Sequence, residues 1–160
     1  MKILVPIDGS TLALEAVRFA VRMVQDGLQA SVVLANVQEP ASFYEIVVAH
    51  DPDVLAKVST QAGEHQLKSA EDLLMAAQIS FEIEIVQGDP AHAIVDIAER
   101  YACDLVVMGS HATGALRSAL TGSVVNDVLQ ACPVPVLCVK AAAVPEDGNF
   151  VPTAPADLRP

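Results

Sequence analysis

The sequence predicts an α/β fold, a single three-layer domain in which a five-stranded parallel sheet carries helices on both faces. The main observation is that apolar runs of strand length alternate with stretches of helical periodicity along residues 1–140. In addition, 52% of the residues are hydrophobic, which fits a sheet buried between helices. This layered arrangement is Rossmann-like.

The first strand is predicted over residues 2–7, where the apolar side chains leave no polar face. Pro6 lacks the N–H that a central strand needs, so we place it at the end of the strand. Asp8 then lies at the carboxyl end, either as a site residue or as an ordinary loop or cap residue. Ser10 follows as the N-cap of the first helix.

A second strand is predicted over residues 29–37 and a second long helix over residues 54–77, with Gly63 expected to interrupt that helix. The stretch between them carries two prolines and is open to three interpretations: a lid, a loop or a short helix. Its His50-Asp51 pair has no further His or Cys at ligand spacing, so we interpret it as a solvated loop rather than a metal site.

Two strands have the marks of sheet edges. Residues 80–86 alternate between apolar and polar side chains, which predicts a half-exposed strand, and Gly88-Asp89-Pro90 then predicts a capped helix start. The last strand, within residues 132–140, begins with two prolines and belongs at the other edge. Its apolar side chains on both faces need a cover, either a second copy of the chain or helices of the same chain.

The stretch 104–123 organises the chain, because a buried strand there runs into a loop punctuated by glycines. Central positions for the first and fourth strands would bring Asp8 and Gly109 side by side at the switch point, where ligands bind in such sheets. The loop ends at Gly122-Ser123, where a helix extending to about residue 131 begins. A helix N-terminus suits phosphate, and glycine permits close approach of the backbone to a ligand.

Composition excludes several classes of function. A formal net charge of -11 disfavours nonspecific binding to nucleic acid or to an anionic membrane, and no apolar run reaches the length of a membrane span. The three cysteines include no C-x-x-C, and no signal-peptide pattern follows Met1, so we expect a reducing cytoplasm. Residues 141–160, with four prolines, are predicted to form a flexible tail outside the domain at 1–140.

The common catalytic and phosphate-binding motifs are missing. The chain has no Walker-type G-x-x-x-x-G-K-[ST] and no G-x-G-x-x-G after the first strand. Neither Ser110 nor Ser123 lies in G-x-S-x-G. His111 is a candidate general base and Arg117 a candidate phosphate ligand, and for each a solvated loop position is the alternative.

Three segments together resemble the universal stress protein family, within the adenine nucleotide α-hydrolase-like group, over residues 1–140. They are ILVPIDGS at 3–10, DLVVMGS at 104–110, and GSV at 122–124 followed by PVPVL at 133–137. The nucleotide-binding branch of this family has the pattern G-x2-G-x9-G-[ST]. Gly109, Gly122 and Ser123 match it, whereas Ala112 stands at the second glycine position.

The resemblance implies a site for ATP, with AMP or ADP as alternatives and Mg as a companion ion. In that site Val37 would read the base edge through its backbone, and Asp8 would contact the ribose or phosphate region. The other residues of the adenine pocket would be Pro6, Ile7 and Met108. The ribose and phosphates would be cradled by Gly109, Ser110, Ala112, Gly122, Ser123 and Val124.

The expected function is therefore that of a cytoplasmic stress-response protein that binds ATP as a regulatory ligand and acts on an unknown protein partner. By the same resemblance it would form a homodimer through the last strand, Val134 to Val139. One alternative is a nucleotide-free dimeric interaction protein of the same fold, which Ala112 favours. Another is a slow ATPase or phosphotransferase using His111, Arg117 and a metal near Asp8.

Overall fold

A computed structural model describes residues 1–38, 52–110 and 124–140, with only the backbone described for residues 52–60 and 62. Within these ranges the chain alternates strands and helices as predicted. The elements are β1 (Lys2–Pro6), α1 (Thr11–Gln25), β2 (Ser31–Gln38), α3 (Pro52–Ala76), β3 (Phe81–Gln87), α4 (Pro90–Arg100), β4 (Leu105–Ser110), α5 (Val124–Ala131) and β5 (Val136–Lys140).

The strands form one five-stranded sheet in the order β3-β2-β1-β4-β5, and every pair in it is parallel. This confirms the predicted fold and the predicted edges: the alternating strand β3 lies at one side and the proline-preceded β5 at the other. It also places β1 and β4 next to each other in the centre. The strand order reverses direction between them, so their carboxyl ends form the switch point of the sheet.

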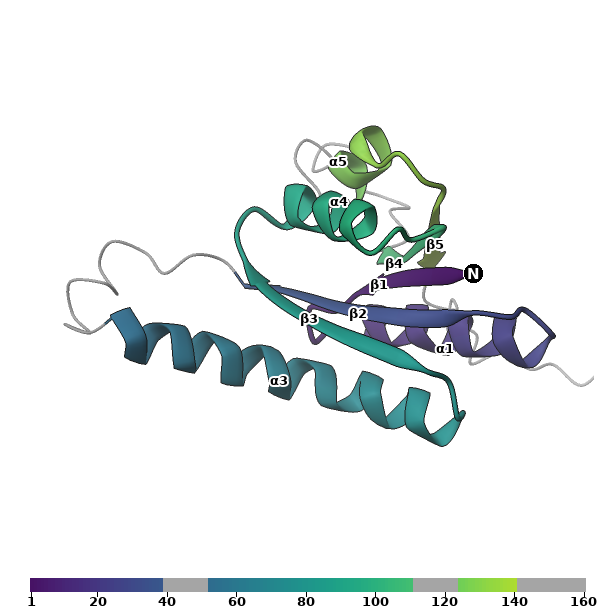
Figure 1. The fold of residues 1–160 in the computed structure, drawn as a ribbon, viewed down its shortest axis with the longest axis horizontal. Helices are drawn as coiled ribbons and strands as arrows, with labels where there is room; N and C mark the ends of the chain where they lie inside the picture. Colours follow the sequence, from purple (N-terminus) through teal and green to yellow (C-terminus); the bar gives the residue numbers. More distant parts are fainter. Residues whose placement is uncertain (39–51, 111–123, 141–160) are drawn as a thin grey trace, which may run out of the picture.

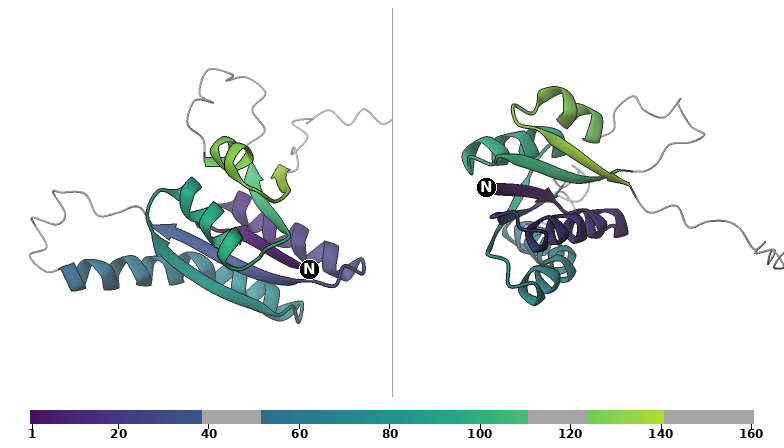
Figure 2. Two further views of the ribbon diagram at one scale, coloured as in Figure 1. Left: turned by 45° about the horizontal axis from the view of Figure 1, so that its top comes forward. Right: turned by 90° about the vertical axis from the view of Figure 1, so that its right-hand side faces the viewer.

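Helices cover both faces of the sheet, α1 and α3 on one and α4 and α5 on the other (Figure 1, Figure 2). Because side chains alternate along a strand, each central strand supplies both cores. The core under α1 and α3 includes Ile3, Val5, Val17, Leu34, Leu67 and Val107. The core under α4 and α5 includes Leu4, Val33, Ile94, Ile97, Val106 and Val128.

Two helix starts form as the sequence predicts. Ser10 is the N-cap of α1, and its side-chain oxygen accepts a hydrogen bond from the Ala13 N–H at 3.1 Å. Asp89 caps α4 in the same way, accepting from the His92 N–H at 3.0 Å, with proline in the first turn. No helix in the described ranges is long and apolar enough to cross a membrane.

The structure corrects the expectation for Gly63, because α3 runs through this residue without a break. A Cβ placed at Gly63 would lie 2.8 Å from Asn36 Oδ1 and 3.0 Å from Ile85 Cγ2. The glycine therefore permits the helix to lie close against β2 and β3. A second difference is the late start of β5, which begins after Pro135 rather than near residue 132 because prolines have no N–H to pair.

The cysteines differ in burial. Cys103 lies within the core, and burial raises the pKa of its thiol, as expected for a structural cysteine. Cys132 and Cys138 are only partly buried, and all three thiols are free.

Gly109 has a packing role that the sequence did not reveal. A Cβ on it would lie 2.5 Å from the backbone carbon and oxygen of Leu12 and 2.9 Å from the Ala13 nitrogen. The close approach that glycine permits here is that of β4 to the first turn of α1.

We therefore predict that Gly109→Ala lowers the free energy of unfolding by about 2 kcal/mol, because the added methyl group meets backbone that cannot move aside. Urea denaturation measures the change. Ser110→Ala, one residue further along β4, is the control and should leave stability nearly unchanged. Equal stability of the two variants would contradict the packing role.

Candidate functional site

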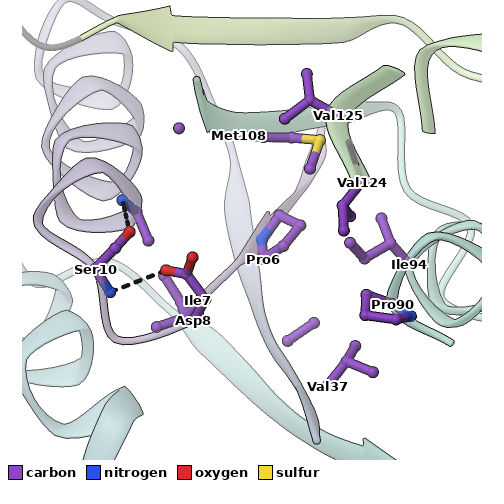
Figure 3. Close-up of a pocket in the computed structure, with 13 residues that line it drawn as sticks. Pro6, Ile7, Asp8, Ser10, Val37, Pro90, Ile94, Met108, Val124 and Val125 are labelled. Carbon is purple, nitrogen blue, oxygen red and sulfur yellow. Dashed lines mark hydrogen bonds between the residues drawn. The ribbon is translucent and has the colours of Figure 1, made fainter. Parts of the chain in front are cut away.

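A pocket of about 280 Å³ lies at the carboxyl ends of β1, β2 and β4, close to the lower end of the range for small-molecule sites, about 300–1,000 Å³. The first turns of α1, α4 and α5 complete its wall (Figure 3). The residues that line it are Pro6, Ile7, Asp8, Ser10, Ala13, Ala35, Val37, Pro90, Ile94, Met108, Gly109, Val124 and Val125.

The carboxylate of Asp8 is held in place by the turn between β1 and α1. Its Oδ1 accepts a hydrogen bond from the Ser10 N–H at 2.9 Å, while Ser10 caps the helix through Ala13 (Figure 3). This short turn fixes the carboxylate at the pocket, and within the described residues its Oδ2 has no hydrogen-bond donor. Such an oxygen accepts hydrogen bonds from hydroxyl groups.

Asp8 is the single charged side chain in the described lining, and Ser10 is its single hydroxyl side chain. The remaining side chains are apolar and come from both layers of the wall: Ala35, Val37 and Met108 from the sheet, and Ile94, Val124 and Val125 from the helices. An apolar pocket with few polar groups suits a partly apolar small molecule that is oriented by hydrogen bonds.

Backbone groups of Val37 provide a further pair of polar atoms. Ser31 N–H bonds to Met1 O and Ile7 N–H bonds to Ala35 O, so the odd-numbered residues of β2 direct their backbone groups toward β1. The ladder between the two strands ends opposite Ala35. Val37 is the next residue of β2 whose backbone groups point toward β1, but at this level the chain has already left β1 for the turn into α1. Its N–H and C=O therefore lie beside the pocket that Val37 lines.

Seven of the predicted site residues line this pocket: Pro6, Ile7, Asp8, Val37, Met108, Gly109 and Val124. Ser110 lies at the end of β4 but outside the lining. Ala112, Gly122 and Ser123 fall outside the described residues, as do His50, Asp51, His111, Arg117 and the tail at 141–160.

Sequence reasoning missed the contribution of α4, Pro90 and Ile94, and it also missed Ala13, Ala35 and Val125. Ala35 could have been predicted, since it lies two residues before Val37 and therefore on the same face of β2. Ser10 was recognised only as a cap. Nothing local in the sequence places α4 over β1 and β2, because that position follows from the packing of the whole layer.

The fold and site define a class: a doubly wound α/β domain with a small-molecule pocket at the switch point between β1 and β4. The model of the Universal stress protein family matches residues 1–140, and the chain belongs to this family. This confirms the resemblance seen in the three sequence segments.

Individual relatives agree with this membership. Universal stress protein MJ0531 of Methanocaldococcus jannaschii is 30% identical over 87% of this chain and 81% of its own length. The solved structure of MJ0577, a universal stress protein of the same organism, is 30% identical with a TM-score of 0.71, covering 88% of this chain and 96% of that chain. A universal stress protein family member from Arabidopsis thaliana, solved with AMP bound, shares the fold at 18% identity and a TM-score of 0.66, covering 89% and 93% of the two chains.

The start of α4, which carries Pro90 and Ile94 to the pocket, depends on a charged cap. The backbone N–H of His92 donates to Asp89, and this bond, together with the His92 side chain, lowers the pKa of that carboxyl below its ordinary value. A carboxyl whose pKa is lowered by folding stabilises the protein above its unfolded pKa, and the contribution is lost as the pH falls through the folded pKa.

We predict that Asp89→Asn is less stable than the wild type above about pH 4, the ordinary range of an aspartate, and that the difference disappears as the pH falls further. Asparagine still caps the helix, so the comparison isolates the charge. Thermal unfolding across pH measures it, with Asp96→Asn on the exposed side of α4 as a matched loss of charge. A difference that grows toward acid pH would contradict the prediction.

Proposed function

We propose that this protein binds an adenine nucleotide in the β1–β4 pocket and that the nucleotide is a regulatory ligand of a cytoplasmic stress-response protein. The observation that carries the proposal is the pair of Val37 backbone groups beside an apolar pocket that the Asp8 carboxylate also lines. Membership of the universal stress protein family supports it, and so does the AMP bound to the Arabidopsis relative.

Each part of the nucleotide has a chemical counterpart in this arrangement. Adenine is flat and presents a ring nitrogen that accepts beside an amine that donates, which matches a backbone N–H and C=O on one residue. The ribose hydroxyls would donate to Asp8. The phosphates of ATP, or of ADP or AMP, would reach toward Gly109, Ser110 and the sequence positions Ala112, Gly122 and Ser123. The described residues contain no cluster of three metal-binding side chains, so Mg would arrive with the phosphates.

The nucleotide-free interaction protein remains the second candidate because of one sequence feature. Ala112 occupies the second glycine position of the family's nucleotide-binding pattern, and its methyl group restricts positive φ. The third candidate, a slow ATPase or phosphotransferase, depends on His111 and Arg117. In the described lining Asp8 is the only charged side chain.

We further propose that β5 pairs with β5 of a second copy. β5 lies at the edge of the sheet, and its apolar residues Val136, Leu137 and Cys138 are only partly buried. Val106 N–H bonds to Pro135 O, so the odd-numbered residues of this strand face β4. The even-numbered residues, Cys138 among them, direct their backbone groups to the open edge.

Calorimetry on nucleotide-stripped protein tests the first proposal. We expect ATP to bind with a Kd in the micromolar range, about -8 kcal/mol. Asp8→Ala should weaken binding by about tenfold or more, because the ribose loses a charge-assisted hydrogen bond. Asp96→Ala, on the exposed side of α4, is the matched control and should bind as the wild type does. Gly122→Val should abolish binding.

No binding of the wild type at millimolar ATP would contradict the nucleotide proposal. In that case the variant Ala112→Gly separates the remaining candidates. If it binds ATP where the wild type does not, Ala112 closes the site and the protein is a nucleotide-free interaction protein. Wild-type affinity in both Asp8→Ala and Gly122→Val would contradict the assignment of the site.

Sedimentation velocity tests the pairing of β5. We predict a dimer for the wild type and a monomer for Cys138→Pro, since proline removes an outward N–H without touching the bonds to β4. Cys138→Ala keeps that N–H and should remain dimeric. A dimer in both variants, with unchanged circular dichroism, would contradict pairing through this edge.

A further inference from the structure

Asn36 is the one polar side chain buried in the described part of the chain, with no exposed surface. It lies on β2 directly before Val37, and its side chain points to the opposite face of the sheet. Val32 and Leu34, which share its alternation, belong to the core under α1 and α3, whereas Val33 and Ala35 belong to the core behind the pocket. Asn36 therefore reaches the pocket only through the backbone.

Both N–H groups of the Asn36 amide donate hydrogen bonds, and its oxygen accepts one. Its Nδ2 donates to the carbonyl oxygen of Ile7 at 2.7 Å and to Gln66 Oε1 at 2.6 Å. Its Oδ1 accepts from Gln38 Nε2 at 2.5 Å, and Gln38 also donates to Gln66 at 3.1 Å. A network of this kind, in which Asn36 is fully buried and the two glutamines are partly buried, fixes the amide in one orientation. Gly63 leaves the space beside Asn36 Oδ1 that the network occupies.

The bond to Ile7 replaces one that a regular parallel ladder would make. Ile7 N–H already bonds to Ala35 O at 2.7 Å, so continuing the ladder by one step would join Val37 N–H to the Ile7 carbonyl. The ladder stops opposite Ala35 instead, and that carbonyl accepts from the Asn36 side chain. β1 thus ends one bond early, and Val37 N–H keeps no partner on β1.

We infer that Asn36 is a positioning residue for the ligand site: by occupying the Ile7 carbonyl from the far face of the sheet, it keeps the Val37 N–H available to an acceptor atom of the ligand. The inference rests on the proposed nucleotide function for the identity of that acceptor, a ring nitrogen of adenine. It also explains the buried network, because Gln38 and Gln66 hold Asn36 at the one carbonyl that would otherwise close the ladder.

Amide hydrogen exchange in the unliganded protein tests the inference without any nucleotide. We expect the Val37 N–H to exchange about tenfold faster than the Ala35 N–H two residues earlier, which lies inside the ladder. In Asn36→Leu the Ile7 carbonyl becomes free, and Val37 exchange should slow to the Ala35 rate. Equal protection of Val37 and Ala35 in the wild type would overturn the inference, and this comparison needs no variant to fold.

Gln66→Leu is the matched control for a polar-to-apolar change in the same buried network. It leaves the Asn36 bond to Ile7 and the Gln38 bond to Asn36 in place, so Val37 should still exchange quickly. Slow Val37 exchange in Gln66→Leu and fast exchange in Asn36→Leu would overturn the assignment of the role to Asn36.

Base selectivity provides a second readout, which a merely structural role would not change. Inosine triphosphate has the size of ATP but presents a ring N–H and a carbonyl where adenine presents an acceptor and an amine. We expect Asn36→Leu to weaken ATP binding by about tenfold and leave inosine triphosphate nearly unchanged, so that selectivity falls. A parallel loss for both ligands would overturn the inference. Failure of the wild type to bind ATP would contradict the proposed function alone, since the exchange comparison still decides the role of Asn36.

Discussion

The early end of the β1–β2 ladder is the constraint on which the site depends. β1 pairs with β2 only as far as Ala35, and the chain then turns through Asp8 into α1. The turn opens the edge of β2 at Val37 and places a carboxylate beside it, while β4 bounds the other side. The reversal of strand order between β1 and β4 is what leaves this space uncovered by a crossover helix.

Most of the fold was predictable because its signals are local. Apolar strands, the Ser10 and Asp89 caps and the alternating edge strand each follow from a few adjacent residues. The edges and centre of the sheet followed from which strands carry polar faces or prolines. Gly63 misled the prediction, since glycine weakens a helix by propensity, yet here tertiary contact with Asn36 requires it.

The site was predictable where it lies on the strand ends, and less so elsewhere. Asp8 and Gly109 follow from the rule that ligands bind at the carboxyl ends of parallel strands, whereas Val37 and Met108 were expected from the family resemblance. Pro90 and Ile94 reach the pocket only because α4 packs across β1 and β2. This packing joins segments far apart in the sequence, and no local sequence pattern predicts it. The role of Asn36 could not be predicted for another reason. A polar residue in an apolar strand does not reveal whether its side chain faces a ligand, the solvent or a backbone carbonyl on the opposite face of the sheet.

The central claim is that the Val37 backbone is the recognition edge of an adenine nucleotide site. An NMR titration of ¹⁵N-labelled protein with AMP tests it most directly, because it reports each amide separately. The account predicts that the Val37 amide proton moves downfield as it gains an acceptor, with the largest shifts clustered around the ends of β1 and β2. Saturable shifts elsewhere in the protein, with the Val37 amide unmoved, would contradict it.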